Sequence, residues 1–172
     1  MSSWLPLSIL FAAAAVGQPL VNGPVIIFMG PPASGKSTQA KMVAQTLKLP
    51  VLSAEEMIAA NPKALSTRPG ITGIDPRTDP ALNSLFEAAI ASETYRGGLI
   101  VDGYPATKDH IDHLRMLVTG GRLPSPVILQ FDIPDEELRK RLGKKADNGF
   151  EQLLKDYHRE IDMFSLYFPP PP

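Results

Sequence analysis

The chain has 172 residues, the length of one domain, and 44% of them are hydrophobic, which is enough for a core. The formal net charge is −1, so the composition gives no sign of the basic surface that nucleic-acid binding requires. The absence of cysteine excludes disulfides, thiolate metal sites and a cysteine nucleophile.

The N-terminal segment, residues 1–22, is apolar, and the first charged residue of the chain is Lys36. The run from Trp4 to Val16 is shorter than the roughly 20 residues that span a bilayer, so we expect no stable membrane span. It fits a secretory signal cleaved near Ala15-Val16-Gly17, although no Lys or Arg precedes it. It fits an arm packed on the domain equally well. The localisation stays open: cytoplasmic for an arm, secreted or periplasmic for a signal.

The following residues predict the first half of an α/β domain. Val25–Met29 is a continuous apolar run and predicts a buried parallel strand. Apolar spacing predicts a helix over 37–47, then a short strand over 50–52 and a short helix over Ala54–Ala60. Residues 61–80 contain four prolines and two glycines, which predict an irregular segment. Loops of this length are usually functional or mobile.

The second half of the domain continues the alternation of strands and helices. An amphipathic helix is predicted over 80–94, and Leu99–Asp102 reads as a third strand that ends in an acid. Thr107 is placed to cap the next helix, which Gly120-Gly121 ends. The remaining predictions are a strand over 127–133, a helix opened by Pro134, a last helix over 150–167 and a stiff tail, Pro169 to Pro172. This order predicts parallel strands joined by right-handed crossovers.

The segment after the first strand matches the phosphate-loop pattern G-x-x-x-x-G-K-[ST] at every fixed position. Its glycines allow backbone N–H groups to converge on an anion, and the following helix adds its positive end. We expect Lys36 to neutralise the β- and γ-phosphates of ATP and the Ser37 hydroxyl to bind Mg²⁺. The predicted nucleotide contacts are Gly30, Pro31, Ala33, Ser34, Gly35, Lys36, Ser37 and Thr38.

Asp102 is the second candidate for a metal ligand. An acid at the tip of a buried strand lies beside a phosphate loop in this kind of sheet, where it holds Mg²⁺ directly or through water. The alternative interpretation is an ordinary turn or helix-capping aspartate in Asp102-Gly103.

Five stretches resemble the adenylate kinase family of nucleoside monophosphate kinases. They occur in that family's order over about residues 25 to 168, and the phosphate loop and DGYP are the most specific of them. The stretches are GPPASGKSTQA, LSAEEMIAA at 52–60, LIVDGYPATKDH at 99–110, FDIPDEELRKRL at 131–142 and YHREIDMFSLYF at 157–168.

The resemblance implies a parallel sheet with helices on both faces, in the strand order 2-3-1-4, with the family's fifth edge strand absent. It implies one kinase-like domain over 23–168, with an acceptor lid at 61–80 and a reduced ATP lid at 143–149. The implied reaction transfers the γ-phosphoryl group of ATP to a nucleoside monophosphate such as AMP, with Mg²⁺. The implied partners are small nucleotides bound by a monomer.

On the donor side, Arg141 matches a family arginine and is implied to act in catalysis with Lys36 and Asp102. Lys144 and Lys145 stand near two further family arginines and are implied to bind the nucleotide, where with Arg141 they would cover the transferring phosphate. They are point charges and lack the bidentate geometry of a guanidinium.

On the acceptor side, the chain departs from the family. The two arginines that hold the acceptor phosphate fall on Ala59 and Ala106, and a third falls on Leu153. The glutamine that reads the acceptor base falls on His110.

Other side chains could take over these functions. Lys63, Arg68, Arg77 and Lys108 are the candidate replacement cations, although surface charges of this kind are usually solvated. His110 and His113 lack a third metal ligand at a defined spacing, so we expect both to be exposed helix residues. Three hypotheses remain: a nucleoside monophosphate kinase, a kinase with a different acceptor, and a nucleotide-binding module without turnover.

Overall fold

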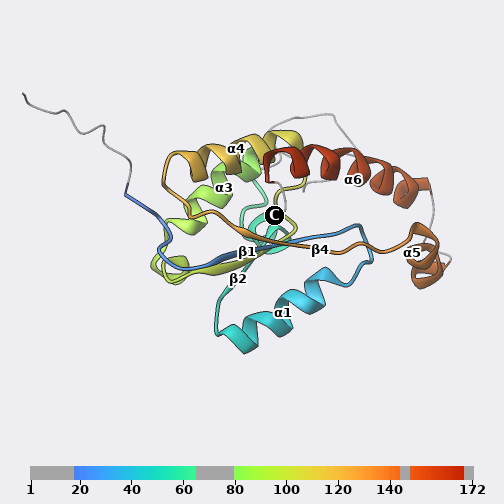
Figure 1. Cartoon of the computed structure of the whole chain (residues 1–172), viewed down its shortest axis with the longest axis horizontal. Coiled ribbons are helices and arrows are strands. Elements are labelled where there is room, and N and C mark those ends of the chain that lie inside the picture. Colours follow the sequence, from blue (N-terminus) through green and yellow to red (C-terminus); the bar gives the residue numbers. More distant parts are fainter. Residues whose placement is uncertain (1–17, 65–79, 144–147, 169–172) are drawn as a thin grey trace, which may run out of the picture.

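The computed structural model describes residues 18–64, 80–143 and 148–168. Its centre is a four-stranded parallel sheet in the order β2-β3-β1-β4 (Figure 1). This confirms the predicted α/β class and strand order. The elements are β1 Val25–Met29, α1 Lys36–Leu47, β2 Val51–Ser53, α2 Ala54–Ala60, α3 Ala81–Ile90, η2 Glu93–Tyr95, β3 Leu99–Asp102, α4 Lys108–Thr119, β4 Val127–Gln130, α5 Asp135–Leu142 and α6 Asn148–Tyr167.

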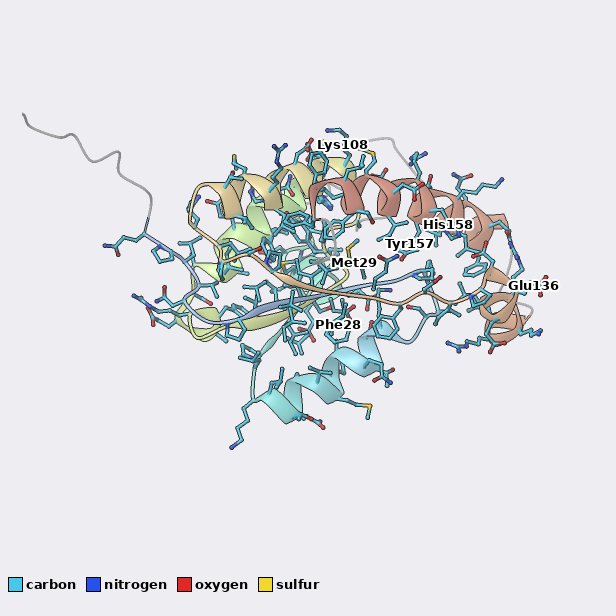
Figure 2. All side chains as sticks on the ribbon, in the orientation of Figure 1. Phe28, Met29, Lys108, Glu136, Tyr157 and His158 are labelled. Atoms are coloured by element: carbon cyan, nitrogen blue, oxygen red, sulfur yellow. The ribbon has the colours of Figure 1, made fainter. Side chains whose placement is uncertain are left out.

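The sheet separates helices into two layers. In Figure 1, α1 lies on one face, and α3, α4 and α6 lie on the other. Successive side chains of a strand point to opposite faces. Accordingly, Phe28 packs with Ala40 and Ala44 of α1, whereas Met29 joins the larger core beneath the other helices (Figure 2).

The register brings the carboxyl ends of the strands together. Phe28 of β1 pairs with Asp102 of β3, and Asp102 in turn pairs with Ser53 of β2. On the other side of β1, Met29 pairs with Gln130 of β4. The chain leaves β1 at this edge as the phosphate loop, so the loop and Asp102 are neighbours because of the register.

Local sequence signals explain the helix ends. The Ser53 side chain accepts a hydrogen bond from Glu56 N at the start of α2, and Thr107 accepts one from His110 N at the start of α4. These bonds satisfy N–H groups that a helix end leaves without partners. The predicted Thr107 cap and the end of α4 at Gly120 are both confirmed.

Residues before β1 contact the domain. Leu20 N donates to Arg122 O and Asn22 N donates to Arg96 O, each over 2.8 Å. Val21 between them is 1% exposed and belongs to the main core. Residues 1–17, which carry the signal-or-arm alternative, lie outside the described residues, as does the tail at 169–172.

Two predicted elements were longer than those observed. The fourth strand ends at Gln130 and not at residue 133, although Phe131 N still donates to Met29 O of β1 over 2.8 Å. The helix predicted over 80–94 is α3 followed by the separate turn η2. Most of the irregular segment, residues 65–79, lies outside the described part. No helix within the described ranges is long and apolar enough to cross a membrane.

Candidate active site

The phosphate loop adopts a tight turn with left-handed backbone at two positions. The φ angles of Ala33 and Gly35 are 64° and 86°, and Ser34 N donates to Pro31 O over 3.2 Å. Left-handed residues beside right-handed ones turn successive N–H groups towards one point, which is the geometry of an anion nest. α1 begins at Lys36, so its positive end points into the same place.

Gly30 is required by close packing. A Cβ there would lie 2.8 Å from Ser34 Oγ and 2.9 Å from Phe131 Cβ. Gly35 has open space around its Cβ position and is required by its positive φ angle instead. The two fixed glycines of the motif therefore serve different needs.

Asp102 lies at the end of β3 with 7% of its surface exposed. Its Oδ1 has no hydrogen-bond partner among the described residues, and neither has the buried hydroxyl of Ser34. A buried carboxylate oxygen without a partner is unfavourable unless a ligand completes it. Carboxylate and hydroxyl oxygens are ligands that Mg²⁺ prefers, so the residues present fit a magnesium-bound nucleotide.

Arg141 of α5 contacts the phosphate loop. Its Nη1 lies 3.4 Å from Ser34 O, and its Nε donates to Glu137 over 3.3 Å. α5 itself lies beyond the carboxyl ends of β1 and β4 (Figure 1). Lys144 and Lys145 lie outside the described residues.

The three positions on which the family's acceptor-side arginines fall carry no charge in this chain. Ala59 is exposed at the end of α2, and Ala106 and Leu153 are partly exposed. Lys108 is exposed and forms an ion pair with Asp112, whereas Lys63 is an exposed residue after α2. The other two candidate cations, Arg68 and Arg77, lie outside the described residues.

The prediction that His110 and His113 are exposed is wrong. His110 is fully buried: its Nδ1 accepts a hydrogen bond from Ala106 N over 3.3 Å, and its ring stacks on Tyr104. The side chain of His113 is 12% exposed. Both residues lie on the side of α4 that packs into the fold. There the Nδ1 of His110 accepts from the backbone of Ala106, and the two ring nitrogens of His113 lie against Tyr104 and Glu87. Sequence spacing alone does not show such partners.

The polar contacts of two residues, Tyr104 and Arg139, were not predicted. The hydroxyl of Tyr104 sits within hydrogen-bond distance of Asn83 and His113, inside the core. Arg139 binds Glu151 through two bonds of 2.7 and 2.8 Å and so joins α5 to α6. The tyrosine in DGYP, where the family motif has phenylalanine, was the available signal for the first contact.

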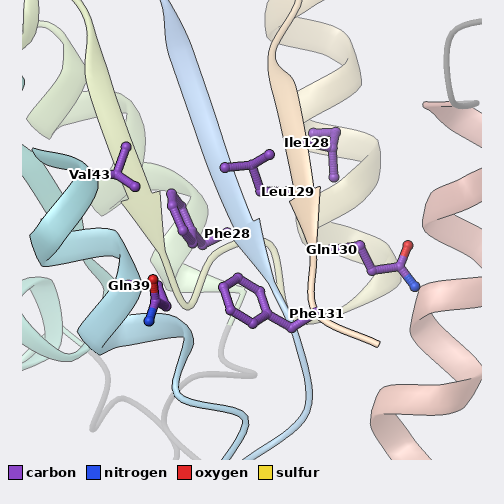
Figure 3. A pocket seen from close by; sticks show the side chains of 7 residues that line it. All are labelled: Phe28, Gln39, Val43, Ile128, Leu129, Gln130 and Phe131. Atoms are coloured by element: carbon purple, nitrogen blue, oxygen red, sulfur yellow. The ribbon is translucent and has the colours of Figure 1, made fainter. Parts of the chain in front are cut away.

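A groove of about 360 Å³ opens between α1 and β4. Figure 3 shows the side chains of Phe28 and Phe131 at its floor and Gln39 of α1 at its rim. The two rings are 5.8 Å apart, and Phe131 is also the residue packed against Gly30. The groove therefore lies next to the phosphate loop, on the face of the sheet that α1 covers.

Comparison with known proteins agrees with this geometry. A family model described as an AAA domain matches residues 29–153. The adenylate kinase of Micrococcus luteus is 32% identical over 152 residues, which cover 80% of this chain and 74% of that protein. The chain belongs to the adenylate kinase family.

Other members of the family are similar at lower identity. The adenylate kinase of Renibacterium salmoninarum is 29% identical over 72% of this chain and 67% of its own length. The adenylate kinase of Mycolicibacterium vanbaalenii is 28% identical over 78% of this chain and 77% of its own length. Family membership supports a P-loop nucleotide kinase, and the divergence leaves the acceptor to be determined.

Proposed function

We propose that this adenylate kinase family member transfers the γ-phosphoryl group of ATP to a nucleoside monophosphate such as AMP. The observation that carries the proposal is a complete phosphate loop with Asp102 beside it, whose buried Oδ1 has no partner among the described residues. An oxygen of the acceptor phosphate would form the new bond to the γ-phosphorus. The oxygen bridging the β- and γ-phosphorus would leave with the electron pair, as part of ADP.

The residues of the loop would bind and orient the donor. Its N–H groups and Gly30, Pro31, Ala33, Ser34, Gly35 and Thr38 would enclose the phosphates, and Lys36 would offset their charge. Ser37 and Asp102 would hold Mg²⁺, which when bound supplies positive charge to the leaving phosphates. Arg141, with Lys144 and Lys145, would cover the transferred group. Catalysis of this kind rests on positioning and charge neutralisation.

A second candidate function follows from Ala59 and Ala106. Each guanidinium–phosphate pair contributes about 1.5–3 kcal/mol as a charge-assisted hydrogen bond. Loss of two pairs lowers affinity for a monophosphate by roughly two to four powers of ten. An acceptor that carries a hydroxyl and no phosphate would not need these arginines.

The test is transfer from γ-labelled ATP by the full chain, with Lys36→Ala as the control. AMP, CMP, UMP, GMP and dTMP form one set of acceptors, and small hydroxylated compounds form the other. Lys36-dependent labelling of one monophosphate supports the first function, and labelling only of a hydroxylated compound supports the second. ATP binding without any labelled product refutes both and leaves a module that binds nucleotide without turnover.

A further inference from the structure

The hydroxyl of Tyr104 is the centre of a polar network inside the fold. Tyr104 is 1% exposed and follows Asp102 by two residues. Its hydroxyl oxygen lies 2.9 Å from Asn83 Oδ1 and 2.9 Å from His113 Nδ1. The carbonyl oxygen of His110 is 3.3 Å away. The phenol has a single hydrogen, so its hydroxyl donates to one of these partners at a time.

The orientation of Asn83 decides where that hydrogen goes. Asn83 Nδ2 donates to Asp109 Oδ2 over 2.9 Å, so the amide oxygen is the atom that faces Tyr104. Two oxygens 2.9 Å apart need a hydrogen between them, and only the phenol can supply it. His113 Nδ1 must then be the donor in its own contact with the Tyr104 oxygen.

The second ring nitrogen of His113 faces a carboxylate. Nε2 lies 3.2 Å from Glu87 Oε2, and the other oxygen of Glu87 accepts from Arg122. Desolvation raises the pKa of Glu87, but hydrogen bonds and charge from Arg122 and His113 outweigh it and leave that pKa below its ordinary value. Glu87 is therefore ionised at neutral pH and only accepts, so Nε2 also carries a hydrogen.

No arrangement with a neutral His113 satisfies every contact. If the phenol donated to His113, the Tyr104 and Asn83 oxygens would face each other without a hydrogen. If the Asn83 amide were turned over, its oxygen would face the Asp109 carboxylate. The first arrangement puts two oxygens 2.9 Å apart with no hydrogen between them, and the second puts an amide oxygen against a carboxylate, so each would create a repulsive contact.

We propose that Tyr104 is a positioning residue: through a doubly protonated His113 it fixes the Asp102–Pro105 turn, and with it the Asp102 carboxylate, against α3 and α4. The charged and titratable groups around His113 are Glu87 on α3, Arg122 beyond α4, Asp109 and His110 on α4, and Tyr104 on the turn. The part played by Asp102 rests on the proposed kinase function, whereas the protonation of His113 does not.

The first measurement is the ¹⁵N shift of both ring nitrogens of His113 at pH 7, assigned with His113→Gln. Two protonated nitrogens in the wild type are expected. In Tyr104→Phe the phenol oxygen is gone, and we expect Nδ1 to lose its hydrogen while Nε2–H still faces Glu87. One bare nitrogen in the wild type overturns the proposal.

The second measurement is the kcat of Lys36-dependent transfer. We expect Tyr104→Phe to lower kcat about tenfold, with the KM for ATP within about twofold of the wild type, because the phosphate loop that would bind ATP is unchanged. Tyr157→Phe is the matched control, since the Tyr157 hydroxyl is buried without a partner in the described part of the chain. An unchanged kcat in Tyr104→Phe refutes the positioning role.

A third readout separates this inference from the proposed function. The amide resonance of Gly103 should move in Tyr104→Phe and stay in place in Tyr157→Phe, with no nucleotide present. If the wild type transfers no phosphoryl group, the proposed function fails, and this resonance alone decides whether Tyr104 holds the turn. If the Gly103 resonance stays in place in Tyr104→Phe, Tyr104 does not hold the Asp102–Pro105 turn.

Discussion

The guanidinium of Arg141 and the carbonyl oxygen of Ser34 lie 3.4 Å apart, although 107 residues separate them in the sequence. This contact joins α5 to the phosphate loop and brings a fixed positive charge to the place where we propose that phosphates bind.

We expect Arg141→Ala to lower kcat/KM for phosphoryl transfer by roughly ten- to a hundredfold, the equivalent of one charge-assisted hydrogen bond. Lys140→Ala removes the same charge from an exposed position of the same helix and should have little effect. Steady-state kinetics on both variants checks this. An equal loss of kcat/KM in the two variants would mean that the total positive charge of α5, and not the position of Arg141, supports the transfer.

Asp102→Asn should separate activity from stability. The substitution removes the charge of a buried carboxylate whose Oδ1 has no partner in the described structure, so the nucleotide-free protein should be at least as stable as the wild type. Magnesium-dependent transfer should fall at least about tenfold, because an amide is a weaker magnesium ligand than a carboxylate. Urea unfolding and a magnesium titration of activity measure the two effects. A loss of stability with full activity would mean that Asp102 serves the turn.

Gly23→Ala should destabilise the fold, whereas Gly97→Ala should not. A Cβ at Gly23 would lie 1.8 Å from the carbonyl oxygen of Gly97, and both belong to backbone that has no room to move apart. Overpacking of this kind costs about 1–3 kcal/mol or more. A Cβ at Gly97 meets nothing within 4 Å. The midpoints of urea denaturation of the two variants give the comparison, and similar midpoints would contradict it.

Lys48→Gly should stabilise the protein by about 0.5–1 kcal/mol. Lys48 ends α1 in the left-handed region with φ 54°, where glycine has no steric penalty. Lys41→Gly, in the middle of the same helix, should have the opposite sign and cost about 1 kcal/mol. Thermal unfolding monitored by circular dichroism measures both changes in stability. A change of the same sign in both variants would refute the prediction.

Glu87 should contribute to acid unfolding. Its pKa in the folded protein lies below the ordinary value of 4.5, so its ion pairs stabilise the protein above pH 4.5 and lose this contribution as the pH falls through the lower folded pKa. In Glu87→Gln the free energy of unfolding should fall less steeply with acid over that interval. Urea unfolding between pH 3 and pH 6 gives both slopes. An unchanged slope would mean that Glu87 does not lose its ion pairs in this interval.

The strand order and the phosphate loop could be predicted because each depends on short sequence signals. Val25–Met29, the G-x-x-x-x-G-K-S pattern and the acid ending Leu99–Asp102 each fix local structure, and the register then brings them together. The ends of α4 followed in the same way from Thr107 and Gly120.

The surroundings of His110 and His113 could not be predicted because they depend on residues far away in the sequence. Asn83 and Glu87 on α3 and Arg122 beyond α4 reach the same interior space as Tyr104 only after the helices pack. The hydrophobic period of α4 places both histidines towards the core. This period does not show whether the core contains polar partners for the two rings, and a buried histidine without partners would be disfavoured.

β4 borders the sheet on one side, and in the described part of the chain no strand pairs with its outer edge. The side chains of Val127 and Leu129 on this strand are 55% and 39% exposed. An apolar strand with unpaired backbone groups is a template for a further strand from another molecule. During heating, loss of soluble protein should therefore depend on its concentration. A lysine at position 129 should slow that loss while leaving the unfolding midpoint in dilute solution almost unchanged.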